Sequence, residues 1–129
     1  MPHLFPVRVY YEDTDLAGVV YYANYLRFIE RARTEWAREA GIDQTRLRSE
    51  DGTVFAVRRI EADYLSPARF DDVLEVGTTL EASSGARIVL LQEIRRGDRM
   101  LFAARVTLVA MDGQGRPRRI PARLLGPGN

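Results

Sequence analysis

Residues 10–40 read YYEDTDLAGVVYYANYLRFIERARTEWAREA, and Gly41 follows them. This stretch joins the end of an alternating segment to an acidic turn and then to an amphipathic segment. Alternation of apolar and polar residues with a period of two is typical of a half-buried strand. One face of the predicted strand carries Val7, Val9 and Tyr11, and the other carries Arg8, Tyr10 and Glu12.

The second half of the stretch has the period of a helix. Its apolar residues recur at steps of three and four, which places them on one stripe that would pack into the core. The stripe consists of Tyr25, Phe28, Ile29, Ala32, Trp36 and Ala40. Asn24 is the predicted N-cap, and Gly41 is the predicted C-terminal stop. We therefore expect one long helix here.

Between these elements lies an acidic turn with three carboxylates in four residues, Glu12, Asp13 and Asp15. Repulsion among them has to be offset by backbone donors, by a cation or by protonation of one member. The helix that follows has unpaired N–H groups and a partial positive charge at its start, so it can stabilise an oxygen on which negative charge develops. A carboxylate beside such a helix end is a candidate acyl-transfer site.

Other interpretations of the acidic turn are open. Taken alone, an Asp-Thr-Asp turn is most often a capped, solvated loop. A calcium loop starting at Asp13 would need an oxygen ligand at Ala17 and a closing glutamate at Asn24, so only Asp13, Asp15 and Gly18 fit that pattern. A phosphotransferase nucleophile would be expected in a larger domain of alternating strands and helices.

The composition excludes several kinds of active site. The chain has no cysteine, so it has no disulfide, no thiol nucleophile and no Cys-ligated metal. Its single histidine, His3, lies near the start of the sequence, which excludes Ser-His-Asp and Cys-His machinery and a His-rich zinc site. The base or nucleophile of an enzyme with this sequence is therefore predicted to be a carboxylate, and we expect no metal.

Charge and hydropathy narrow the class of protein further. A net charge of +1 argues against a nucleic-acid partner. All 19 basic residues are arginine, a bias that phosphate recognition or codon usage would explain. No apolar run is long enough to span a membrane, and the first six residues lack the basic and apolar parts of a signal peptide. We expect a cytoplasmic protein.

The remainder of the chain is predicted to be almost wholly strand. After a loop or short irregular helix at 42–52, apolar patterns predict strands within 54–64, 74–80, 88–94 and 100–111. The strand at 88–94 is apolar on both faces at its start, which suggests a central strand covered on both sides. The tail from Arg116 is predicted to be irregular. The order fits a single α+β domain over residues 1–129, with a five-stranded sheet and its helices on one face.

Several motifs resemble the 4-hydroxybenzoyl-CoA thioesterase family, in particular its YbgC-like branch. They are Asp13-Thr-Asp15, Gly18-Val-Val-Tyr-Tyr-Ala-Asn-Tyr25, Glu30-Arg-Ala-Arg-Thr-Glu35, Val57-Arg-Arg-Ile60, Tyr64 and Ser66-Pro-Ala-Arg-Phe-Asp-Asp72. The likeness covers most of the chain and weakens after about Met111. It implies a hotdog fold, in which an antiparallel sheet wraps around the long helix, and assembly into a homodimer or homotetramer.

The resemblance also implies a reaction, the hydrolysis of an acyl-CoA thioester, with CoA as part of the substrate and no separate cofactor. Asp15 matches the family's catalytic aspartate and would act as nucleophile or general base. The backbone N–H of Tyr22 would stabilise the oxyanion. Many YbgC-like members have histidine at that position, so a mechanism that needs this imidazole is excluded here. Substrate contacts are implied for Gly18, Val19, Val20 and Asn24, and contacts with the CoA phosphates for Arg58 and Arg59.

Two other functions fit the same resemblance. A hotdog scaffold can bind an acyl group or a protein without catalysis, although such a module would not need Asp15 beside a helix start. The other is hydrolysis of thioesters carried by acyl carrier protein. Whether the acyl group is aromatic or short and aliphatic does not follow from the motifs.

Overall fold

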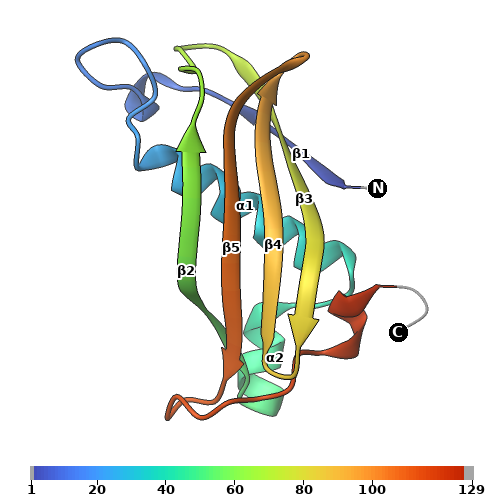
Figure 1. The fold of residues 1–129 in the computed structure, drawn as a ribbon. Coiled ribbons are helices and arrows are strands. Elements are labelled where there is room, and N and C mark those ends of the chain that lie inside the picture. Colours follow the sequence, from blue (N-terminus) through green and yellow to red (C-terminus); the bar gives the residue numbers. More distant parts are fainter. Residues whose placement is uncertain (1, 127–129) are drawn as a thin grey trace.

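A computed structural model describes residues 2–126 of the chain. Its five strands form one antiparallel sheet in the order β1-β3-β4-β5-β2, and a long helix crosses one face of that sheet (Figure 1). The strands are β1 (His3–Arg8), β2 (Val54–Tyr64), β3 (Val73–Ser84), β4 (Arg87–Arg96) and β5 (Arg99–Met111). The helices are α1 (Asn24–Glu39) and α2 (Gln44–Asp51), with 3₁₀ helices at Tyr11–Asp13 and Ala122–Leu125. The predicted α+β hotdog architecture is confirmed.

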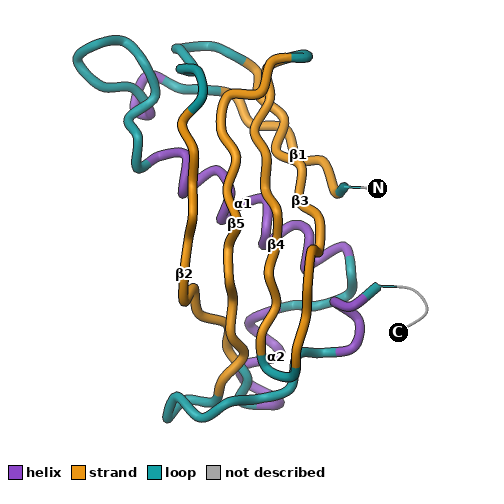
Figure 2. The backbone as a smooth tube through the Cα atoms, in the orientation of Figure 1, coloured by secondary structure: helices purple, strands orange, loops and turns teal. Residues whose placement is uncertain are grey.

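The core lies between α1 and the inner face of the sheet, the two layers visible in Figure 2. Successive side chains of a strand face opposite sides, so alternate residues point toward the helix. Buried inner positions include Leu74, Val76, Ile88, Leu90, Ile94, Phe102 and Val106. On α1, Tyr25, Phe28, Ile29 and Ala32 are buried, while Trp36 and the C-cap residue Ala40 are partly buried against the core. The stripe predicted for the helix is confirmed.

α1 ends at Glu39, just before Gly41, the residue that the sequence predicts to stop the helix. Gly41 has a φ of +92°, which glycine adopts without the steric penalty of a side chain. Its N–H donates to the carbonyl oxygen of Arg38, and the N–H of Ile42 donates to that of Ala37, both at 3.0 Å. These bonds satisfy carbonyl groups that the last turn would otherwise leave unpaired.

The predicted N-cap of α1 is wrong. Ala23 occupies the N-cap position and has no side-chain acceptor to offer, whereas Asn24 is the first residue of the helix. The amide of Asn24 instead donates to Oδ1 of Asp13 at 2.9 Å. A carboxylate is a stronger acceptor than a neutral group, and this partner lies eleven residues away in the sequence. A long-range bond has therefore replaced the local one.

The first strand is shorter than predicted. β1 ends at Arg8, and Tyr11 and Glu12 are exposed residues of a 3₁₀ helix. The cause is the carboxylate of Asp13, whose Oδ2 accepts the N–H of Tyr10 at 2.8 Å. This bond turns the chain away from the sheet immediately after the strand.

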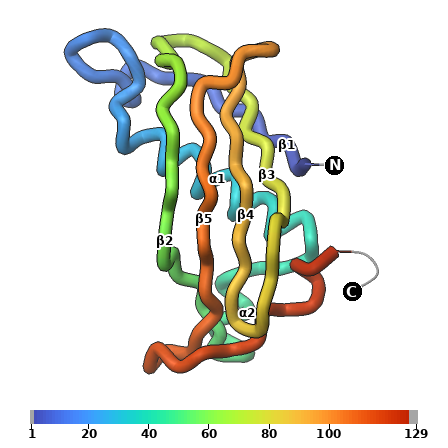
Figure 3. The backbone as a smooth tube through the Cα atoms, in the orientation of Figure 1, coloured from blue at the N-terminus to red at the C-terminus, as the bar shows by residue number. Residues whose placement is uncertain are grey.

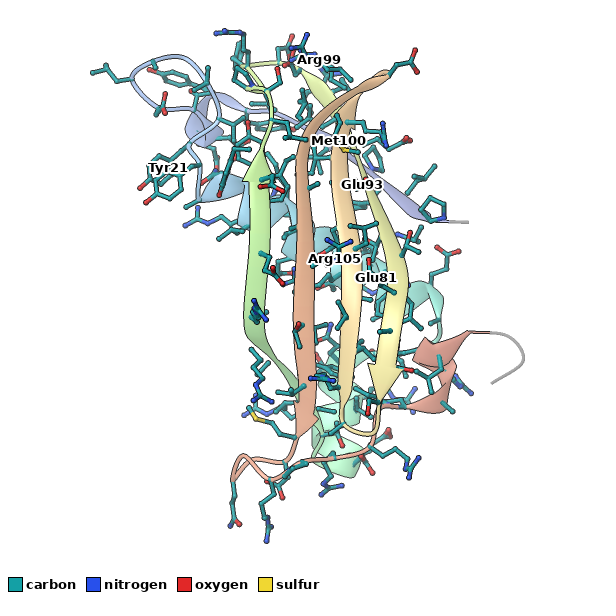
Figure 4. All side chains as sticks on the ribbon, in the orientation of Figure 1. Tyr21, Glu81, Glu93, Arg99, Met100 and Arg105 are labelled. Carbon is teal, nitrogen blue, oxygen red and sulfur yellow. The ribbon has the colours of Figure 1, made fainter. Side chains whose placement is uncertain are left out.

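The outer face of the sheet is not covered by a second layer within residues 2–126 (Figure 1). β4 is the central strand, as predicted, but Val89 and Leu91 point to this side and are only half-buried, so the prediction that both of its faces are covered is wrong for residues 2–126. Arg105 of β5 reaches across β4 to Glu81 of β3, with Nε and Oε1 2.7 Å apart (Figure 4). The charged pair passes over β4 beside Leu91. It places polar groups over an apolar strand on the face that is exposed to water.

β2 lies at one edge of the sheet, beside β5 (Figure 3). Its other edge has no strand partner in the described part of the chain. A β-bulge at Arg58 breaks the register between Val57 and Arg59. An unpaired edge presents a row of backbone N–H and C=O groups that can pair with a further strand.

The tail is more ordered than predicted. Ile120 and Leu124 are buried in the core, and the N–H of Ile120 donates to the carbonyl oxygen of Gly85 at 3.0 Å. Apart from the 3₁₀ helix at Ala122–Leu125 and one bridge at Pro117, residues 116–126 have no regular structure, as predicted. Positions 127–129 lie outside the described residues. None of the described helices combines the length and the apolar character needed to cross a membrane.

The turn after β5 contains a carboxylate that should make the fold sensitive to acid. The N–H groups of Arg116 and Gln114 donate to Oδ1 of Asp112 at 3.0 and 2.9 Å, and the Arg116 guanidinium donates to Oδ2 at 2.8 Å. The backbone bond from Arg116 is the largest cause that lowers the pKa of Asp112, from 3.8 to about 2. Because the folded pKa is depressed, this stabilisation is present above the unfolded value near 3.8 and is lost as the pH falls toward 2.

We therefore expect Asp112→Asn to lower the melting temperature at neutral pH. We also expect the melting temperature of this variant to fall less than that of the wild type as the pH drops from about 3.8 toward 2. The measurement is thermal unfolding by circular dichroism across the acid range. Asp98→Asn, in the exposed β4–β5 turn, is the matched control and should keep the wild-type acid dependence. An unchanged acid profile in Asp112→Asn would contradict this assignment.

Candidate active site

The turn between β1 and α1 presents Asp15 at the surface of the protein. Thr14 and Val20 face each other in an isolated antiparallel bridge, which closes the base of the turn. The N–H of Asp15 donates to the carbonyl oxygen of Val19 at 2.9 Å, and the N–H of Gly18 donates to that of Asp15 at 3.0 Å. Gly18 has a φ of +81°, a conformation that favours glycine. The turn is therefore tight and internally bonded.

The carboxylate of Asp15 has few partners. Oδ1 accepts the N–H of Ala17 at 2.9 Å, while Oδ2 accepts no hydrogen bond within residues 2–126. Burial is the main cause that raises the pKa of Tyr25, and the negative charges of Asp72 and Asp15 add to the rise. Asp15 is thus close enough for its charge to act on the hydroxyl of Tyr25, which lies in the first turn of α1. The site holds a carboxylate oxygen that is available to a bound molecule.

The neighbouring carboxylate of Asp13 has a structural role. It is 6% exposed, and its two oxygens accept the N–H of Tyr10 at 2.8 Å and the amide of Asn24 at 2.9 Å. The backbone carbonyl of Asp13 also accepts the N–H of Tyr21 at 2.8 Å. Backbone and amide donors therefore satisfy one member of the acidic trio, and Asp15 is left exposed. These bonds also fasten the Asp15 turn to the start of α1.

The start of α1 offers hydrogen-bond donors. The backbone N–H groups of Tyr22 and Ala23 have no acceptor in the described part of the chain. The Tyr64 hydroxyl donates to the carbonyl oxygen of Tyr22 at 3.0 Å, which ties the end of β2 to this segment. The rings of Tyr22 and Tyr64 also lie edge to face, with their centroids 6.5 Å apart. Unpaired N–H groups at the positive end of a helix dipole can stabilise an oxyanion.

Apolar side chains are exposed around this site, a feature that the sequence analysis did not identify. Val19 pairs with Arg69 in an isolated bridge, and the N–H of Val20 donates to the carbonyl oxygen of Ala68 at 2.8 Å. The loop at 65–72 therefore lies beside the Asp15 turn. Exposed apolar residues of these two segments and of the adjoining Tyr22–Tyr64 ring pair, here called the apolar rim, are Leu16, Tyr22, Tyr64, Leu65 and Phe70. Clustered exposed apolar side chains mark interaction sites. Only the motif at 66–72 pointed to this loop.

The remaining residues predicted to contact the substrate are not all placed beside Asp15. Gly18 and Val19 lie in the same turn, whereas Val20 is buried and the amide of Asn24 is turned toward Asp13. Arg58 and Arg59 are exposed in the middle of β2, five or six residues before Tyr64, which corresponds to roughly 17–20 Å along the strand. Their roles in substrate binding stay predictions.

Among residues 2–126, no group of three or more His, Cys, Asp or Glu side chains is arranged to hold a metal ion. The chemistry of the described residues here is that of one free carboxylate, backbone N–H donors and aromatic hydroxyls.

Comparison with known proteins identifies the family. The model of the thioesterase-like superfamily matches residues 9–127, nearly the whole chain. The chain belongs to this superfamily. It is a thioesterase of the YbgC-like branch, since the acyl-CoA thioesterase YbgC of Haemophilus influenzae is 44% identical over 91% of this chain and 87% of its own length. The acyl-CoA thioester hydrolase YbgC of Escherichia coli is 42% identical over 94% and 91%.

Solved structures show the same fold. The crystal structure of a probable thioesterase from Bartonella henselae superposes with a TM-score of 0.91 at 40% identity, and the match covers 94% of this thioesterase and all of that chain. The hotdog fold implied by the motifs is confirmed.

The only histidine of this thioesterase lies away from Asp15. Nε2 of His3, at the start of β1, is 2.8 Å from Oε2 of Glu39, the last residue of α1. The sixteen residues of α1 extend for roughly 24 Å, and the Asp15 turn lies at the other end of the helix. Within one chain of this thioesterase, an imidazole therefore cannot replace the missing histidine at Tyr22.

Proposed function

We propose that this thioesterase hydrolyses a short-chain or aromatic acyl-CoA to a free acid and CoA, and that Asp15 is its catalytic carboxylate. The observation that carries the proposal is the pairing of an exposed, sparsely bonded Asp15 with unpaired N–H groups at the start of α1. The names of the YbgC relatives support an acyl-CoA substrate.

Two routes are open for Asp15. As a nucleophile, one oxygen attacks the thioester carbonyl, the thiolate of CoA leaves, and water then hydrolyses the mixed anhydride. As a general base, Asp15 removes a proton from water, which attacks the carbonyl directly and expels the same thiolate. In both routes negative charge develops on the carbonyl oxygen. The N–H of Tyr22 is the proposed donor to that oxygen, and losing one such donor typically costs about 3–4 kcal/mol of transition-state stabilisation.

We also propose that the active form is a homodimer built on the free edge of β2. The unpaired backbone groups of this strand and the exposed side chains of Val57, Tyr64 and Leu65 favour pairing with a second copy. A second copy along this edge would lie near the apolar rim and would shield Asp15 from water. Sedimentation velocity should give at least twice the mass of the chain, and a monomer at assay concentration would contradict this proposal.

The test of the reaction is the release of free CoA from a panel of thioesters. The panel runs from acetyl-CoA through medium-chain acyl-CoA to benzoyl-CoA and 4-hydroxybenzoyl-CoA. Turnover of at least one member supports the reaction, and the preferred member defines the acyl class. A matched thioester on acyl carrier protein distinguishes the two carriers. An absence of turnover on the whole panel would contradict the proposal.

A further inference from the structure

The loop at 65–72 joins β2 to β3 at the end of the sheet where the Asp15 turn lies (Figure 1). Ala68 lies at the centre of this loop and is 0% exposed. The carbonyl oxygen of Ala68 accepts the N–H of Val20 at 2.8 Å, and its N–H donates to the hydroxyl of Tyr25 at 3.0 Å. One residue of the loop therefore links the Asp15 turn to the first turn of α1.

The carboxylate of Asp72 closes this loop. Its Oδ2 accepts the backbone N–H of Arg69 at 2.9 Å and a hydrogen bond from Nη1 of Arg96 at 2.7 Å. The same nitrogen of Arg96 donates to the carbonyl oxygen of Pro67 at 3.4 Å. The residues on either side of Ala68 are therefore both bonded to this pair of side chains.

Arg96 fastens the loop to the central strand of the sheet. It is the last residue of β4, which pairs with β3 on one edge and with β5 on the other. β4 is in turn tied to α1, because Nε2 of the fully buried Gln92 donates to the carbonyl oxygen of Ile29 and to Oγ1 of Thr78, both at 2.9 Å. The side chains of Arg96 and Asp72 are 36% and 23% exposed, so solvent screens their attraction only in part. A charge-assisted bond in this place is stronger than a bond between neutral groups.

A strained residue lies in the same loop. Asp71 has a φ of +70° and is the only residue other than glycine with a positive φ within residues 2–126. Residues with a side chain rarely adopt this conformation, which persists where neighbouring contacts enforce it. Here the N–H of Asp71 donates to the carbonyl oxygen of Val9, and the N–H of Val9 donates to that of Asp72, both at 2.9 Å. The conformation of the loop therefore depends on its contacts with the rest of the chain.

We propose that Asp72 and Arg96 are positioning residues for the reaction. Their ion pair holds the loop at 65–72, and the bond from Val20 to this loop holds Asp15 beside the start of α1. The inference rests on the proposed role of Asp15, and it adds that two side chains acting through the loop set the place of this carboxylate. A displacement of a reacting group by about 1 Å can cost about 10²-fold in rate, so such an indirect contact can control turnover.

Breaking the ion pair should lower kcat while KM stays nearly the same. Asp72→Ala removes the oxygen that accepts both bonds, and Arg96→Gln removes the positive charge. Both variants keep Asp15 and the apolar rim. We expect each to lower kcat on the preferred acyl-CoA by about 10–100-fold, the pattern of an interaction that counts only in the transition state. The measurement is steady-state release of CoA by the full-length protein, corrected for the folded fraction from circular dichroism.

Conservative variants of the same two residues should restore part of the rate. Asp72→Asn keeps an oxygen that can accept both bonds, although without the negative charge. Arg96→Lys keeps the positive charge on a single nitrogen, and one nitrogen makes both of the bonds described above. Combining Asp72→Ala with Arg96→Gln should cost no more than the worse single variant, because the two side chains act through one contact.

Hydrogen exchange gives a readout that global destabilisation would not produce. The N–H of Val20 is protected by its bond to Ala68, so Asp72→Ala and Arg96→Gln should make it exchange faster. Amides of β4 and β5 should exchange as in the wild type. Arg105→Gln is the matched control, because it breaks an ion pair of the same 2.7 Å length on the outer face of the sheet. It should keep the wild-type kcat and the wild-type exchange at Val20.

The outcomes separate this inference from the proposed function. If Asp15→Asn loses activity while Asp72→Ala and Arg96→Gln keep the wild-type kcat, the positioning role is overturned and the catalytic role of Asp15 stands. If Asp15→Asn keeps full activity, the proposed function fails and the positioning role falls with it. A rise in KM without a loss of kcat, or an equal loss of kcat in Arg105→Gln, also overturns the inference. If Asp72→Ala does not fold, Arg96→Gln and Arg96→Lys still decide the question.

Discussion

Replacing Asp15 with asparagine is expected to lower kcat on the preferred acyl-CoA by about 10²–10⁴-fold, the usual effect of losing a catalytic acid or base. Asparagine keeps an oxygen that can accept the N–H of Ala17, so the turn should be retained. What it loses is the negative charge, which both proposed routes require. The measurement is steady-state release of CoA, with circular dichroism to verify the fold.

Glu12→Gln is the matched control for Asp15→Asn. Glu12 is an exposed acid in the same segment, so its replacement removes the same charge from the surface without touching the turn. We expect wild-type kcat from this variant. Full activity in Asp15→Asn, or an equal loss in both variants, would contradict the assignment of Asp15. A single turnover in heavy-oxygen water adds a mechanistic test, because label recovered in the Asp15 carboxylate requires the anhydride route.

Replacing Phe28 with alanine is expected to lower the free energy of unfolding by about 3–5 kcal/mol, a large part of the roughly 5–15 kcal/mol of a typical domain. Phe28 is 0% exposed between α1 and the sheet, and its ring lies edge to face with that of Tyr25 at 6.3 Å. Truncation removes apolar contact and leaves a cavity, which a packed core closes only in part.

The measurement for Phe28→Ala is urea unfolding followed by the fluorescence of Trp36, at a fixed protein concentration because self-association also stabilises the fold. Arg99→Ala is the control. Arg99 is exposed at the start of β5, away from the apolar rim, so its truncation should change the free energy of unfolding by less than about 0.5 kcal/mol. A loss of similar size in both variants would show that Phe28 is not a central part of the core.

The spacing of apolar residues along the sequence correctly predicted the buried side of α1 and the strand β5. The stripe from Tyr25 to Ala40 became the buried side of α1, because residues three and four apart on a helix must share a face. The alternation at 100–111 became β5 for the corresponding reason in a strand. The same alternation through Tyr11 gave the wrong end for β1, since it carries no information about the bond between Asp13 and Tyr10 that turns the chain.

The sequence predicted less of the candidate site than of the fold. It identified the acidic turn and the start of the helix, because an acidic turn before an amphipathic segment is visible in the sequence itself, whereas only the family resemblance singled out Asp15 among the three carboxylates. It missed the apolar rim, since Leu16 and Phe70 are brought to the same region only by the bridge between Val19 and Arg69. It also assigned Asn24 to the helix cap, because its actual partner, Asp13, belongs to a different turn.

Gln92 fixes the position of α1 along the sheet. Apolar packing alone is tolerant of sliding, because one methyl group can replace another along a smooth sheet. The two bonds from Nε2 of Gln92 tie one particular carbonyl of α1, that of Ile29, to one particular position of the sheet. A helix displaced by one turn, about 5.4 Å, would break the bond to Ile29 and leave a buried donor unpaired at a cost of about 1–3 kcal/mol. The buried amide of Gln92 therefore fixes the position of α1 along the sheet. It thereby also fixes the position of the N–H of Tyr22 at the amino end of this helix.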